Sequence, residues 1–222
     1  PTVTPAAFDR DDLATSIGEL QRSLRGFAEG LRRSNSAEPR AYSLLRTAAW
    51  LPITRPPPVE DGTTALPEMD TDVAVGLENR LKDGDLPAVI QTAEAAIIDA
   101  PFWLAAHRFT AAALGQLGDS HADARKVVIA ELATFLRRFP AVPKLQFSSG
   151  ATFADPATAA WIEEEVLAGQ ASAGGGGEAG AWEAGMSQAR QAAAKGKIND
   201  AFGIFSIGRQ SAPSGRAQFL WE

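Results

Sequence analysis

Residues 77–97 read LENRLKDGDLPAVIQTAEAAI and decide the fold, because they hold two helical patterns on either side of a tight turn. Apolar residues recur in steps of four before and after Gly84-Asp85, and these are Leu77, Leu81, Val89, Ala93 and Ile97. Glycine readily ends a helix, and Pro87 falls in the first turn of the next one, where its missing N–H costs no hydrogen bond. The stretch therefore predicts a helix, a tight turn and a second helix.

The same pattern returns at Gly118-Asp119, which lies 34 residues after the first turn. The flanking apolar residues predict helices over 104–117 and 124–139, and a third small turn is expected at Gly196-Lys197. This interval is the period of tetratricopeptide repeats, although the other positions of that repeat match poorly. We therefore predict an all-α fold of stacked helical hairpins, with about seven helices and no regular repeat array.

A long amphipathic helix is expected at the start of the chain, over residues 9–35. Its apolar residues alternate in steps of four and three, and they are Leu13, Ile17, Leu20, Leu24, Phe27 and Leu31. A stripe with this spacing usually faces the core of its own domain, but it also matches the seam of a coiled coil. The six residues are therefore candidates for self-association as well as for the core.

A second helix is expected from the N-cap Ser36 to Leu51, with Pro39 in its first turn. Residues 52–67 should then form an extended, proline-rich wrap over the domain, because the prolines at 56–58 forbid a helix. Residues 145–153 suggest a short extended or turn segment, after which Asp155-Pro156 should begin another helix.

Three parts are expected along the chain. Residues 1–168 form the main helical domain, and residues 169–180, rich in Gly, Ala and Ser, form a flexible linker with nothing to bury. Residues 181–222 begin a second helical domain. The start at Pro1 and the end shortly after an apolar segment begins, at 219–222, predict that the chain is a piece of a longer protein.

Composition argues against several classes of function. The net charge of −6 disfavours nucleic-acid binding through the overall field, and there is no cysteine for a disulfide, a thiolate metal site or a nucleophile. No apolar run approaches the roughly 20 residues that span a bilayer, so membrane insertion is not expected. A protein without thiols suits the reducing cytoplasm.

The search for chemistry finds no catalytic, metal-binding or cofactor-binding residues. His107 and His121 are the two histidines, and they stand too far apart for a local metal pair. His107 is expected to be a satisfied or half-buried histidine on an apolar helix face, and His121 to be exposed after a turn. Three consecutive acids at 163–165 diverge around a helix, whereas paired-carboxylate hydrolysis needs two that converge. An enzyme is not expected.

A group of aromatic and basic residues is suited either to a core or to a protein interface. Its members are Arg40, Tyr42, Arg46, Trp50 and Trp161. Core or wrap contacts are the first interpretation and an interface is the second.

Residues 38–53, EPRAYSLLRTAAWLPI, together with the motifs that follow through Leu66-Pro67, resemble the middle domain of TssA proteins, the VasJ-like group. Later stretches with the same order and spacing are residues 101–104, 114–118, 139–140 and 147–155 with Trp161. Residues 194–197 and 214–221 look like the opening of the family's C-terminal ring-forming domain. The family's N-terminal ImpA-like region is absent, and the C-terminal domain stops soon after it begins.

This resemblance implies a non-enzymatic subunit of the bacterial type VI secretion system. Such a subunit is located in the bacterial cytoplasm on the secretion apparatus and acts with baseplate, contractile sheath and tube proteins during assembly. The resemblance implies a dimer of the middle domain through its first helix and a ring through the C-terminal domain, with Trp182, Phe219 and Trp221 as candidate ring contacts. The alternative interpretation is a free-standing helical adaptor of tetratricopeptide-like architecture that binds extended peptides.

Overall fold

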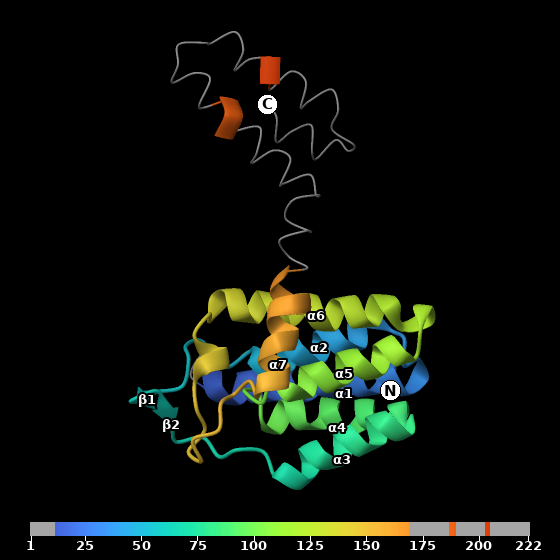
Figure 1. The fold of residues 1–222 in the computed structure, drawn as a ribbon, viewed down its shortest axis with the longest axis horizontal. Coiled ribbons are helices and arrows are strands. Elements are labelled where there is room, and N and C mark those ends of the chain that lie inside the picture. The colour runs from blue at the N-terminus through green and yellow to red at the C-terminus, as the bar shows by residue number, and fades with distance from the viewer. Residues whose placement is uncertain (1–11, 169–186, 190–202, 205–222) are drawn as a thin grey trace. The chain divides into compact units, whose positions relative to one another are not determined.

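The computed structural model describes residues 12–168, 187–189 and 203–204 (Figure 1). The chain divides into two units, Pro1–Val166 and Leu167–Glu222. Seven α-helices have defined bounds among the described residues: α1 Leu13–Ser34, α2 Pro39–Trp50, α3 Thr71–Asp83, α4 Leu86–Asp99, α5 Ala105–Gln116, α6 Ala122–Arg138 and α7 Pro156–Trp161. The predicted all-α fold is confirmed for this part of the chain.

Capping residues set where the first two helices begin. The Asp12 carboxylate accepts a hydrogen bond of 3.0 Å from the backbone N–H of Thr15, so α1 begins at Leu13; residues 9–11 of the expected helix lie outside the described residues. The N-cap of α2 is Glu38 and not Ser36, because Pro39 takes the first helical position. The carbonyl of Ser36 instead accepts a hydrogen bond of 2.7 Å from the Tyr42 hydroxyl.

The turn predicted at Gly84-Asp85 is confirmed. Gly84 has a φ of 79°, in the left-handed region that favours glycine, and its N–H donates to the carbonyls of Arg80 and Leu81. Helix α4 follows at once. The second predicted turn is also present, but a 3₁₀-helix, Asp119–His121 (η1), lies between Gly118 and α6.

The segment after α2 differs from the predicted extended wrap, because the chain reverses direction within it. Strands β1 (Val59–Glu60) and β2 (Thr63–Thr64) pair antiparallel around Asp61-Gly62. Both turn residues have positive φ, 49° and 83°, as the favoured two-residue hairpin loops require. The backbone N–H of Thr64 donates to the carbonyl of Gln146 over 2.8 Å, which ties this hairpin to the loop after α6.

That loop begins with the 3₁₀-helix Val142–Lys144 (η2) and ends at Asp155, the N-cap of α7. The helix predicted after Asp155-Pro156 therefore forms. Its continuation, Ile162–Leu167 (η3), is a π-helix, a rare element that the sequence pattern did not predict.

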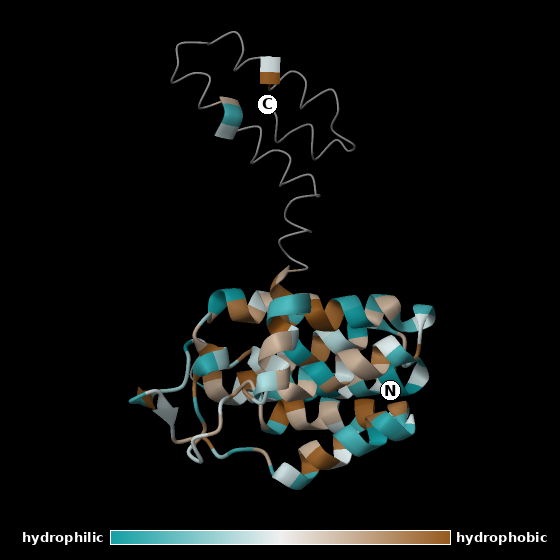
Figure 2. Cartoon of the chain, in the orientation of Figure 1, coloured by the Kyte–Doolittle hydropathy of each residue, from teal (hydrophilic) through white to brown (hydrophobic). Residues whose placement is uncertain are grey.

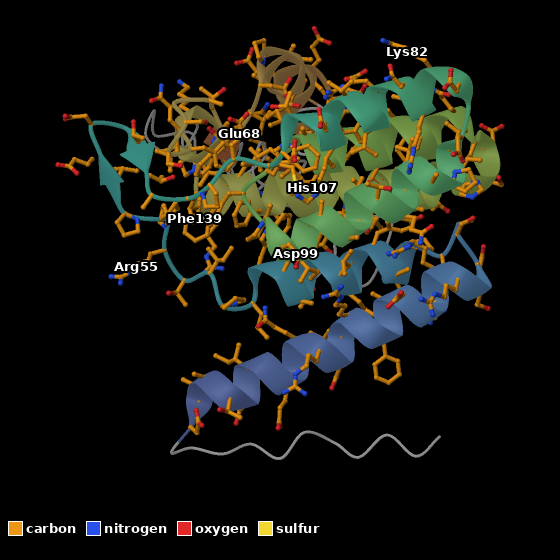
Figure 3. All side chains as sticks on the ribbon, turned by 90° about the horizontal axis from the view of Figure 1, so that it is seen from below. Arg55, Glu68, Lys82, Asp99, His107 and Phe139 are labelled. Carbon is orange, nitrogen blue, oxygen red and sulfur yellow. The ribbon has the colours of Figure 1, made fainter. Side chains whose placement is uncertain are left out.

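Helices α2 and α5 are central, since α2 packs on α1, α4 and α6, and α5 packs on α3, α4, α6 and α7. Each helix carries hydrophobic and hydrophilic residues along its length (Figure 2). Aromatic rings fill the core where α2 meets α6, with Trp50 and Phe135 stacked at a centroid distance of 4.3 Å. Helix α1 is the outermost helix on one side of this unit (Figure 3).

Candidate functional site

The apolar stripe of α1 is split between the core and the solvent. Leu13, Leu20 and Phe27 are 54%, 42% and 51% exposed. Ile17, Leu24 and Leu31 are half-buried, and Leu31 packs against the core. The two sets form two columns, each with a seven-residue spacing. The sequence left both a core stripe and an outward seam open, and the helix carries one exposed column and one half-buried column.

Two glycines stand beside the outward column, and none of the described residues packs against them. A Cβ placed on Gly26 or Gly30 would meet no atom within 4 Å. Glycine in a helix interior costs about 0.5–1 kcal/mol relative to alanine, and no turn or close contact among the described residues requires it at these positions. The outer surface of α1 around Phe27 is therefore both apolar and free of bulky neighbours.

The aromatic and basic group divides differently. Tyr42 and Arg46 are fully buried, and Trp50 and Trp161 are 8% and 9% exposed, so these four side chains belong to the core of the unit. Arg40 is exposed, and its Nε donates to the Glu38 carboxylate over 2.7 Å.

Arg46 is the cation of a fully buried ion pair that sequence patterns missed. Its Nη2 donates to Oε1 of Glu94 on α4 over 2.9 Å, and its Nη1 donates to Oε2 over 3.2 Å. The hydroxyl of Thr110 on α5 donates to the same carboxylate over 2.9 Å. Nη1 of Arg32 on α1 lies 3.9 Å from Oε2. The network thus joins helices α1, α2, α4 and α5.

His107 lies in the core beside this network, and its ring is tilted by 38° to that of Trp50, with the ring centroids 5.3 Å apart. Neither ring nitrogen has a hydrogen-bond partner among the described residues, so the prediction of a satisfied or half-buried histidine was wrong. Burial lowers the pKa of His107 well below its usual value, and the nearby Arg46 guanidinium lowers it further. The side chain is therefore neutral at neutral pH. Burial also raises the pKa of Tyr42, and the Glu94 carboxylate adds to the effect.

His121 was predicted to be exposed, but it is half-buried between two serines. Its Nε2 lies 3.0 Å from the Ser36 hydroxyl and its Nδ1 lies 2.9 Å from that of Ser120. It therefore joins the end of α1 to the turn before α6.

Two cavities adjoin on the part of the unit formed by α3, the end of α4 and the loop before α7. The larger has a volume of about 580 Å³ and the smaller about 270 Å³. Both are lined by Glu68, Met69, Trp103 and Phe147, so they are neighbours, and we call the two together the groove.

Three further findings concern the remaining candidates. Trp182, Phe219 and Trp221 lie outside the described residues, as do the expected linker and the turn at 196–197. Among residues 12–168, 187–189 and 203–204, no cluster of three or more His, Asp or Glu side chains is arranged to hold a metal ion. No helix in the same residues is long and apolar enough to cross a membrane.

The fold and its surface define a class of protein: an all-α unit whose exposed features are an apolar helix face and a groove, both suited to contact with other chains. Comparison with known families agrees with this class and narrows it. Residues 14–222 match the family described as type VI secretion, EvfE, EvfF, ImpA, BimE, VC_A0119, VasJ, and the chain belongs to that family. No curated protein matches the chain significantly. The chain is therefore a component of type VI secretion of the TssA type.

Proposed function

We propose that this chain is a non-enzymatic assembly subunit of the type VI secretion apparatus, and that copies of it meet through the outer face of α1. Membership of the family supports the secretion role. The outward column of Leu13, Leu20 and Phe27 carries the proposal of self-contact, because exposed apolar side chains repeated every seven residues lie on one face of the helix and supply one of the two apolar positions of a coiled-coil seam. Gly26 and Gly30 would let a second backbone approach closely.

The strength of this contact follows from the exposed area. Each of the three side chains is already about half buried, so covering the rest contributes about 1 kcal/mol apiece. A symmetric pair covers six such side chains, which gives about 6 kcal/mol before the cost of association. The α1 contact alone is therefore weak, and it acts best in a subunit that is also held elsewhere.

The second contact between copies lies in the C-terminal part of the chain. The helices stack as hairpins in a middle domain, residues 1–168, and a linker, residues 169–180, leads to the start of a helical C-terminal domain at 181–222. Trp182, Phe219 and Trp221 contribute to a ring through that domain. The assembled subunit works in the bacterial cytoplasm with baseplate, sheath and tube proteins.

The experiment replaces this protein in its bacterium with the double variant Leu20→Glu, Phe27→Glu and counts fluorescent sheaths per cell. Fewer sheaths are expected. The matched control is Ala14→Glu with Arg25→Gln, which changes the charge of α1 by the same amount at two exposed positions off the stripe. Normal sheath numbers in the first strain, or an equal loss in the control, would refute the role of this face.

A further inference from the structure

The groove described above lies on a different side of the unit from α1. Glu68 and Lys82, which both line it, lie across the domain from α1 in Figure 3, whereas Asp99, which lines the smaller cavity, lies nearer to α1. The groove is therefore a surface that the proposed contact between copies leaves open.

The floor of the groove is apolar and held in place. Trp103, Phe147 and Phe153 line it, and each is less than a tenth exposed. The backbone N–H of Ser148 donates to the carbonyl of Leu66 over 2.8 Å, and that of Leu104 donates to the carbonyl of Phe153 over 3.2 Å. These bonds fix both walls, so a ligand need not order them on binding.

All the charged residues that line the smaller cavity are acids. Glu68, Asp70 and Asp99 line it, and no Lys or Arg does. Asp70 caps α3, and Glu68 accepts a hydrogen bond of 2.6 Å from Ser149. Asp99 is exposed, and its carboxylate forms no hydrogen bond or ion pair with any of the described residues. The larger cavity is lined by two basic residues: Arg108, which donates to Glu78 and Thr158, each at 3.0 Å, and the exposed Lys82.

The wider sequence has the same charge bias. Residues 59–99 contain ten acids and two basic residues. An apolar cavity with carboxylates at its edge that form no ion pair favours a ligand that has an apolar group beside a cationic group. The apolar group fills the cavity, and the cationic group pairs with the carboxylates.

We propose that this groove binds an extended segment of a partner protein in which a large apolar side chain is flanked by Lys or Arg. The apolar side chain enters the smaller cavity, and the basic neighbours face Asp99 and Glu68. A second copy of this chain is a poor occupant through α1, because a helix is about 10–12 Å wide and does not fit a cavity of about 270 Å³. The proposal does not depend on the α1 contact and goes beyond it.

The test uses the whole chain of 222 residues and fluorescein-labelled peptides Ser-Lys-Φ-Lys-Ser, where Φ is Leu, Met, Phe or Trp. Fluorescence anisotropy at low salt should show saturable binding of at least one of them, with a Kd below about 1 mM. Peptides with Glu in place of Lys, or with Ser at Φ, should not saturate. Salt should weaken the binding severalfold, because the charges are near the surface.

The variant Asp99→Lys should bind the best peptide at least about tenfold more weakly. Its matched control is Asp83→Lys, since Asp99 and Asp83 are the last residues of α4 and α3, both are exposed, and Asp83 does not line the groove. Equal circular dichroism of the two variants shows that folding is intact. The proposal is overturned if no peptide binds, if Glu-flanked peptides bind equally, or if both variants behave alike. The proposal is also overturned if Asp99→Lys leaves peptide binding unchanged but lowers the mass of the self-assembled chain, because the occupant of the groove is then a second copy.

Discussion

Replacing Glu94 with leucine should destabilise the protein more than replacing its partner Arg46 with methionine. Without Glu94, the Arg46 guanidinium keeps only the carbonyl of Tyr42, at 3.1 Å, and Arg32 loses its nearest carboxylate. Arginine cannot shed its proton in a protein, so a cation stays buried without a counter-charge. Without Arg46, by contrast, the Glu94 carboxylate keeps Thr110 and the nearby Arg32, and it can take up a proton.

The magnitudes follow from the same contacts. Breaking a buried pair by removing one partner costs about 3–5 kcal/mol. We expect Glu94→Leu at the upper end, about 5 kcal/mol, and Arg46→Met at the lower end, about 3 kcal/mol. The double variant should lose much less than the sum, about 2 kcal/mol, because apolar replacements of both charges remove the unpaired ion.

The assay is urea denaturation followed by far-UV circular dichroism, with thermal unfolding as a second measure. At about 2–4 °C per kcal/mol for a chain of this size, Glu94→Leu should lower Tm by about 10–20 °C. Thr110→Val is a milder control that removes one hydrogen bond to Glu94 and should cost about 1–2 kcal/mol. If Arg46→Met is the more damaging single change, or if the double variant equals the sum of both, the reasoning fails.

Further predictions concern single positions. The pKa of His107 is lowered in the folded chain, so as pH falls His107 takes up a proton in the unfolded chain before it does so in the folded chain. The folded chain therefore keeps its stability above the unfolded pKa of about 6.5 and loses stability as pH falls below it. His107→Leu should reduce this loss of stability by up to about 1.4 kcal/mol per pH unit. The urea midpoint of the variant should therefore change less between about pH 6.5 and 5 than that of the unaltered chain. An unchanged pH dependence of the midpoint would contradict this prediction. Gly84→Ala should cost about 1 kcal/mol through its φ of 79° alone, since nothing crowds a Cβ there, and Gly84→Asn should cost less in the same assay. Asp155→Ala should lower the free energy of unfolding by about 1–2 kcal/mol, because it removes the two capping hydrogen bonds, both 3.0 Å, from the N–H groups of Ala157 and Thr158. Calorimetry that shows no loss of stability would contradict this capping role.

Local sequence signals predicted the helices well because each has a local physical cause. The turn at Gly84 requires a left-handed residue, and Asp155-Pro156 both caps and begins a helix. The chain reversal at Asp61-Gly62 also had a local signal, the Asp-Gly pair, but the neighbouring prolines favoured an extended interpretation.

Long-range pairing was not predictable in the same way. Arg46 and Glu94 are 48 positions apart, and only the folded chain brings them together. The one available signal was a charged residue inside each of two otherwise apolar helix faces, since such a charge needs a partner. The split of the α1 stripe was likewise hidden, because spacing gives the face of a helix but not which half of that face the neighbouring helix covers.

The most direct test of the assembly proposal is the mass of the whole chain in solution, measured by light scattering up to about 1 mM. We expect a mass that rises with concentration above the 23.4 kDa of one chain, and a smaller rise for Leu20→Glu, Phe27→Glu with unchanged circular dichroism. The control Ala14→Glu, Arg25→Gln should behave as the unaltered chain does. A mass fixed at one chain throughout, or an equal rise in both double variants, would contradict the proposal that copies of this protein meet through α1.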